Sequence, residues 1–125
     1  MTSTPRYRLG VLLGDGIGPE IVPASVRVVD AALAATGAGS VDWRELPLGA
    51  SAIEEHGSAI PDATLTALGE LDGWLLGPHD SAAYPEPFRS QLNPSGAIRK
   101  HFDLYANIRP ADSRAGRPSP RTPTW

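Results

Sequence analysis

The first forty residues predict a strand followed by a helix. Residues Tyr7–Leu13 (YRLGVLL) form a short apolar run that ends at a glycine, as is typical of a buried strand. Pro19 and Glu20 then favour the first turn of a helix. The helix should carry one apolar face, because apolar residues recur at spacings of four and three: Val22, Val26, Val29 and Leu33. Gly37 and Gly39 are expected to end it.

The alternation of strands and helices continues towards residue 110. Short apolar or alternating runs predict strands at Val41–Leu48, Gly73–Leu76 and Leu104–Ile108. Helical spacing or start signals predict helices at Ala50–His56, from Pro61–Asp62 onwards, and at Pro94–His101. The composition of residues 77–87 predicts a loop. We therefore expect an α/β fold, a layered and mostly parallel sheet with helices.

The character of the chain changes after Pro110. Residues 111–125 (ADSRAGRPSPRTPTW) are rich in proline and arginine and poor in apolar residues. Such a segment buries too little surface to offset the entropy of ordering it. The predicted organisation is one domain at residues 1–110 and a disordered or out-of-frame tail at residues 111–125.

Composition excludes several classes of function. The net charge of −3 gives no general attraction to nucleic acid or to an anionic membrane. No apolar run is long enough to span a membrane, and no signal peptide is recognisable, so a cytoplasmic location is expected. The absence of cysteine excludes disulfides and thiolate metal ligands. The three histidines lack metal-ligand spacing, and Tyr84 and Tyr105 are expected to be packing residues.

The sequence Gly14-Asp-Gly-Ile-Gly-Pro-Glu20 follows the first predicted strand. Glycines there allow a sharp turn or the close approach of a ligand, and the helix start behind them offers free N–H groups. The spacing is GxGxG, which differs from the GxGxxG dinucleotide fingerprint. Both a plain strand-to-helix turn and a ligand-binding loop fit this motif.

Two arginines ten residues apart form the second candidate. Arg99 lies late on a predicted helix, and Arg109 ends the strand predicted after it. A return from helix to strand could bring both guanidinium groups to one cleft, where they would suit a substrate with several carboxylates. The alternative is two solvated surface arginines.

Taken together, GDGIGPE near the N-terminus and IRKHFDLYANIRP about eighty residues later resemble the isocitrate/isopropylmalate dehydrogenase family. The resemblance runs from about Leu9 to Pro110. It implies the fold of that family, present here in part, which is not a Rossmann fold. It also implies metal-dependent oxidative decarboxylation of a malate-type 2-hydroxyacid with NAD or NADP and with Mg²⁺ or Mn²⁺. Parent enzymes of this kind are homodimers.

The resemblance also assigns residues. Arg99 and Arg109 would bind the carboxylates of a di- or tricarboxylate substrate. Ile17 would lie beside the nicotinamide ring, and Asp80 and Ser81 would approach the nicotinamide ribose.

Ser95 would lie on the helix face that reads the variable group of the substrate. The surrounding Asn93–Ala97 stretch is polar and small, whereas isopropylmalate enzymes resemble one another in placing leucines there. This disfavours 3-isopropylmalate and leaves isocitrate, tartrate and other malate derivatives open.

No catalytic residue and no metal ligand is assigned, because the tyrosine, lysine and aspartates of the family have no match after Pro110. We therefore expect a truncated or frameshifted member. Two alternatives stand beside the dehydrogenase hypothesis. The first is a non-catalytic remnant with at most weak carboxylate or cofactor binding, and the second is an ordinary dinucleotide-binding module.

Overall fold

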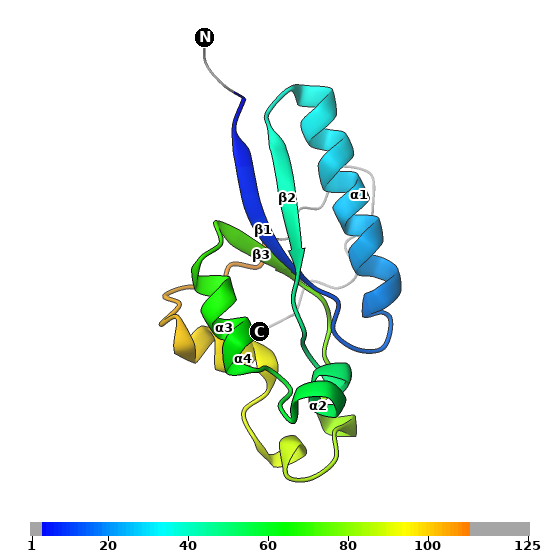
Figure 1. Cartoon of the computed structure of the whole chain (residues 1–125), viewed down its shortest axis with the longest axis vertical. Helices are drawn as coiled ribbons and strands as arrows, with labels where there is room; N and C mark the ends of the chain where they lie inside the picture. The colour runs from blue at the N-terminus through cyan, green and yellow to red at the C-terminus, as the bar shows by residue number, and fades with distance from the viewer. Residues whose placement is uncertain (1–3, 111–125) are drawn as a thin grey trace, which may run out of the picture.

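The computed structural model describes residues 4–110, which form a small parallel sheet with helices on both faces (Figure 1). The elements in chain order are β1 Arg6–Leu12, α1 Gly18–Thr36, β2 Ser40–Glu45, α2 Ala50–His56, α3 Asp62–Gly69, β3 Gly73–Leu76, the 3₁₀ turns η1 Ser81–Ala83 and η2 Phe88–Ser90, and α4 Pro94–His101. The α/β fold predicted from the sequence is confirmed.

The sheet has the strand order β2-β1-β3, and both pairings are parallel. The chain passes from β1 through α1 to β2 on one side, then returns through α2 and α3 to β3 on the other side. Because parallel crossovers share one hand, these two connections cover opposite faces of the sheet. Figure 1 shows α1 on one face, with α3 and α4 on the other.

Helix α1 forms as its apolar spacing predicts. Val22 is buried on the face turned to the sheet, and Gly37 ends the helix in a left-handed conformation with φ of 65°. In this conformation its N–H donates to the carbonyl of Leu33, which is a common helix end. Pro23 is tolerated because it lies close to the helix start.

The main core lies between the sheet and the α3–α4 layer. Its buried members are Leu12, Leu46, Leu48, Ala67, Leu68 and Ile98. Gly10 makes this packing close, because a Cβ atom there would lie 3.1 Å from Leu71 Cδ1 and 3.3 Å from Leu68 Cδ2. The rings of Trp74 and Phe102, with centroids 5.1 Å apart, extend the same layer.

The second strand is shorter than predicted. It ends at Glu45, because Pro47 has no N–H for the ladder and the chain turns to bury Leu46 and Leu48 in the core.

The prediction of a strand at Leu104–Ile108 is wrong. Residues 104–110 have no regular structure, and no described segment pairs with them. Helix α4 ends in a Schellman motif, with Asp103 at φ of 48° and the Leu104 N–H donating to the Arg99 carbonyl at 3.0 Å. The chain then leaves the core, so Tyr105 is fully exposed rather than packed, and Ile108 is 83% exposed. A strand needs a neighbour for its backbone groups, and this segment has none within residues 4–110.

The tail predicted at residues 111–125 lies outside the described residues, and the boundary at residue 110 stays a prediction. Within the described part of the chain, no helix is long and apolar enough to cross a lipid bilayer.

Candidate functional site

The candidate site lies where β1 and β3 end side by side. Leu12 of β1 pairs with Leu76 of β3, so the loops that follow both strands leave the same edge of the sheet. This is also the point at which the chain order reverses, because β2 lies on one side of β1 and β3 on the other. Ligands of open α/β sheets bind preferentially in the crevice at such a point.

The three glycines of the GDGIG turn have different roles. Side chains at Gly14 and Gly18 would collide with the carbonyl oxygens of Pro78 and Leu13, so these two glycines allow the backbones to pack closely. Gly16 has φ of 58°, and apart from its two chain neighbours no atom of residues 4–110 lies within 4 Å of the Cβ position that a side chain would occupy. Only Gly16 is therefore open to a ligand, and the other two serve the turn itself.

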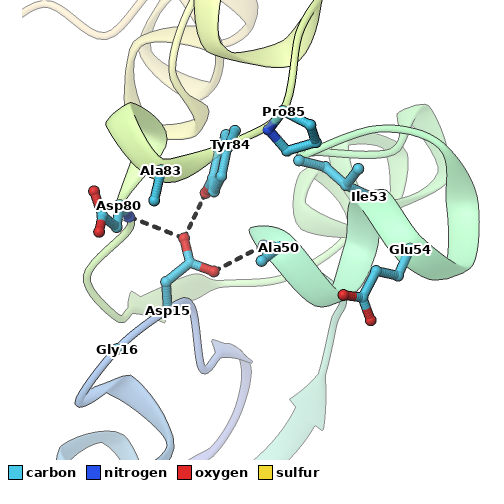
Figure 2. A pocket seen from close by; sticks show the side chains of 9 residues that line it. All are labelled: Asp15, Gly16, Ala50, Ile53, Glu54, Asp80, Ala83, Tyr84 and Pro85. Carbon is cyan, nitrogen blue, oxygen red and sulfur yellow. Dashed lines mark hydrogen bonds between the residues drawn. The ribbon is translucent and has the colours of Figure 1, made fainter.

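Asp15 ties this turn to two other segments. One carboxylate oxygen, Oδ1, accepts a hydrogen bond from the N–H of Ala50 at the start of α2, at 2.7 Å. The other, Oδ2, accepts from the N–H of Asp80 at 2.9 Å and from the hydroxyl of Tyr84 at 2.5 Å. Figure 2 shows these three donors converging on the one carboxylate. In addition, the Asp15 N–H donates to the carbonyl of Pro78 at 2.7 Å.

These contacts determine the protonation states of Asp15 and Tyr84. Burial raises the pKa of Asp15, but the hydrogen bonds from Tyr84, Ala50 and Asp80 outweigh it and hold that pKa below its usual value of 3.8. Burial, the hydrogen bond to Asp15 and the nearby charges of Asp15 and Asp80 all raise the pKa of Tyr84 above its usual value of 10.0. At neutral pH the carboxylate is therefore ionised and the phenol keeps its proton.

A cavity of about 280 Å³ opens beside Asp15, between α2 and η1. Figure 2 shows its lining residues, which come from three segments of the chain: Asp15, Gly16, Ala50, Ile53, Glu54, Asp80, Ala83, Tyr84 and Pro85. Its walls combine apolar side chains with three carboxylates.

A second polar link joins the β3 loop to helix α4. His79 Nε2 lies 3.0 Å from the hydroxyl of Ser95, which donates to the Asn93 side-chain oxygen at 3.2 Å. That same oxygen caps α4 by accepting from the Gly96 N–H at 2.8 Å. The other ring nitrogen of His79, Nδ1, is buried and has no hydrogen-bond partner within residues 4–110.

Six site residues are assigned from the sequence. The structure places four of them at this edge of the sheet, namely Ile17, Asp80, Ser81 and Ser95. Ile17 caps the start of α1 and is 62% exposed. Asp80 reaches the same turn through its bond to Asp15, Ser81 follows it, and Ser95 joins through His79. Asp80 contributes its backbone to the link and leaves its own carboxylate exposed. The cofactor and substrate roles of these residues stay predictions.

The two arginines are not seen to share a cleft. Arg99 is an exposed residue of α4, and Arg109 is exposed in the irregular segment, where its Nε donates to the Asn107 side chain at 3.4 Å. The strand that was expected to carry Arg109 back towards Arg99 is not formed. The binding of carboxylates by Arg99 and Arg109 therefore stays a prediction.

Sequence reasoning missed Asp15, Tyr84 and His79 as members of the site. Asp15 lies inside the GDGIG motif. Aspartate is common in turns because its side chain accepts hydrogen bonds from nearby backbone N–H groups, and this signal could have identified Asp15. Tyr84 and His79 lie in a stretch whose composition predicts a loop. No local pattern indicates their distant partners; that of Tyr84 is Asp15, 69 residues away.

Within residues 4–110, no three His, Asp or Glu side chains are grouped so that they could hold a metal ion. The residues present there do not fit the divalent metal that the family resemblance implies.

Comparison with known proteins gives one family. The profile described as isocitrate/isopropylmalate dehydrogenase matches residues 8–123, which extends past Pro110. Among curated proteins, the chain is 42% identical over 106 residues to a 3-isopropylmalate dehydrogenase of Desulfitobacterium hafniense, covering 82% of this chain and 30% of that protein. It is 39% identical over 108 residues to a protein of the same name from Aquifex aeolicus, covering 85% and 29%.

Solved structures agree. A beta-decarboxylating dehydrogenase from Thermococcus kodakarensis in its apo form matches with a TM-score of 0.63 and 30% identity, covering 79% of this chain and 27% of that one. An isocitrate dehydrogenase from Methylococcus capsulatus matches with a TM-score of 0.59 and 31% identity, covering 74% and 25%. The chain thus spans less than a third of the length of these relatives.

Proposed function

This chain belongs to the isocitrate/isopropylmalate dehydrogenase family, and from that premise we propose that it provides part of the cofactor- and substrate-binding surface for oxidative decarboxylation of a malate-type 2-hydroxyacid. The reaction is NAD(P)-linked and metal-dependent in the family. In this proposal Ile17, Asp80 and Ser81 bind the nicotinamide end of the cofactor. Arg99 and Arg109 bind the carboxylates of the substrate.

The convergence on Asp15 is the observation that carries this proposal. Its carboxylate holds the Ile17 turn and the Asp80–Ser81 turn together at the carboxyl ends of two adjacent parallel strands. A cofactor that meets both turns needs them at a fixed separation, and the hydrogen bonds from Asp80 and Tyr84 to this one carboxylate provide it. Gly16 leaves the backbone between them open to a ligand.

The substrate class is a hydroxyacid with two or three carboxylates. The start of α4 is polar, with Ser95 hydrogen-bonded to Asn93 and close to His79, which favours a polar variable group such as that of isocitrate or tartrate. The two curated relatives described above carry the name 3-isopropylmalate dehydrogenase. For this reason 3-isopropylmalate belongs in any substrate test.

The metal would be Mg²⁺ or Mn²⁺, which supplies a Lewis acid for the forming carbonyl. Because residues 4–110 do not provide its ligands, we assign no catalytic step to them. The second candidate function is a chain that binds carboxylate or cofactor weakly without turnover. Assembly into a homodimer, as in the parent family, also remains a proposal.

A turnover assay separates the two candidates. The purified chain is mixed with NAD or NADP, Mg²⁺ or Mn²⁺, and 3-isopropylmalate, isocitrate, tartrate or malate, and formation of the reduced cofactor is followed by absorbance. Turnover that Arg99→Ala abolishes, with Arg44→Ala as an exposed-arginine control, supports the dehydrogenase. No turnover with any combination supports the binding-only candidate.

A further inference from the structure

We infer that Asp15 and Tyr84 are positioning residues for the nicotinamide end of the cofactor, which deepens the proposed function and rests on it. Neither residue is needed as a ligand-contacting group for this role. They set the distance between the turn that carries Ile17 and the turn that carries Asp80 and Ser81 (Figure 2).

Tyr84 holds η1 against the turn between β1 and α1. This residue follows η1 directly, is only 4% exposed, and donates to Asp15 from 69 positions along the chain. The Asp80 N–H donates to the same oxygen, Oδ2. The η1 segment between these two donors is therefore attached to Asp15 at both of its ends, and Ser81 lies inside it.

Asp15 is the centre of these hydrogen bonds. Its carboxylate is occupied on both oxygens, by Ala50 on one and by Asp80 and Tyr84 on the other. Gly49 precedes α2 with φ of 86°, and a side chain there would collide with this carboxylate. Gly49 thus leaves room for the Asp15 side chain, and both carboxylate oxygens accept hydrogen bonds from other parts of the protein.

Asp15 and Tyr84 are not suited to proton transfer. The hydrogen bonds lower the pKa of Asp15 despite its burial, and burial together with the Asp15 charge raises the pKa of Tyr84. An ionised carboxylate that already accepts three hydrogen bonds is a poor base. A phenol whose pKa is raised is a poor acid near neutral pH. The pair is therefore suited to hold geometry, and Ile17, two residues after Asp15, is the exposed group that it places.

The test is a titration of the whole 125-residue chain with NADH and NADPH, followed by nicotinamide fluorescence. Tyr84→Phe keeps the buried ring and removes only the hydroxyl, and Tyr105→Phe is the matched control at a fully exposed tyrosine. We expect Tyr84→Phe to weaken binding about tenfold, the effect of losing one hydrogen bond to a charged group. We also expect the emission of bound NADH at saturation to shift towards that of free NADH. Tyr105→Phe should change neither.

The emission at saturation reports only on folded, occupied protein, so a loss of stability alone does not move it. Unchanged affinity and emission in Tyr84→Phe, with binding by the wild type intact, overturn this inference and leave the proposed function standing. No binding of either cofactor by the wild type overturns the proposed cofactor role, and the positioning role falls with it.

Discussion

The hydroxyl of Tyr84 donates a 2.5 Å hydrogen bond to Oδ2 of Asp15 and so connects the end of η1 to the turn between β1 and α1. A bond from a buried donor to an ionised acceptor contributes more than a neutral one at the surface. The first prediction concerns its contribution to stability. We expect Tyr84→Phe to lower the free energy of unfolding by about 1–3 kcal/mol, measured by urea denaturation.

Tyr105→Phe is the control for this measurement, since its side chain is fully exposed and should change stability by less than about 0.5 kcal/mol. Equal effects of the two substitutions would show that the Asp15–Tyr84 bond does not stabilise the fold.

A second prediction concerns pH. The pKa of Asp15 is lower in the folded chain than its usual value of 3.8, so its stabilising effect is complete above that pH and is lost as the pH falls through the folded value. The pKa of Tyr84 is raised in the folded chain, so its contribution is complete below its usual value of 10.0 and is lost as the pH rises above it. Unfolding free energy measured against pH should therefore fall at both ends. Asp15→Asn should flatten the acid end and Tyr84→Phe the alkaline end; a wild-type profile that both variants reproduce in shape refutes this account.

The third prediction separates the glycines of the GDGIG turn. Gly18→Ala places a methyl group against the Leu13 carbonyl oxygen and should cost about 3 kcal/mol in unfolding free energy. The added methyl group of Gly16→Ala meets no tertiary neighbour in the described part of the chain, so this variant should cost only about 1 kcal/mol for its positive φ. Thermal and urea unfolding of both variants give the comparison, and similar stabilities for the two would contradict the roles assigned here.

A fourth prediction concerns the segment after α4. Leu104, Tyr105 and Ile108 are 48%, 102% and 83% exposed within five residues of one another. Exposed apolar groups of this size favour association. Replacing Tyr105 and Ile108 together by serine should reduce concentration-dependent self-association in sedimentation velocity. Val28→Ser, at a 68% exposed residue of α1, is the control, and an equal reduction there would mean that the segment has no special part in association.

Much of the fold could be predicted from local signals. The spacing of Val22, Val26, Val29 and Leu33 predicts α1, and Pro94–His101 is a helix with the bounds expected from the sequence. Local signals alone could not decide whether Leu104–Ile108 forms a strand. Its sequence suits a strand, but strand formation depends on a neighbouring backbone, which a single-sequence pattern does not reveal.

The site was predictable only in part. The glycine motif indicates a turn at the end of β1, and the family resemblance adds Ile17, Asp80, Ser81 and Ser95, which lie at one edge. The bonds that organise this edge join residues 65 and 69 positions apart, and such pairs depend on the sheet order. The composition around His79 predicts only a loop, although the side chain of His79 lies against Ser95.

The central claim is that the edge formed by the ends of β1 and β3 binds the nicotinamide cofactor. Backbone amide NMR spectra of the chain, recorded during a titration with NADH, test it most directly. The account predicts saturable shifts at Gly16, Ile17, Asp80 and Ser81, with none at Gly39 and Ser40, which lie at the opposite end of the sheet beside a separate cavity. Absence of shifts, or shifts confined to Gly39 and Ser40, would contradict it.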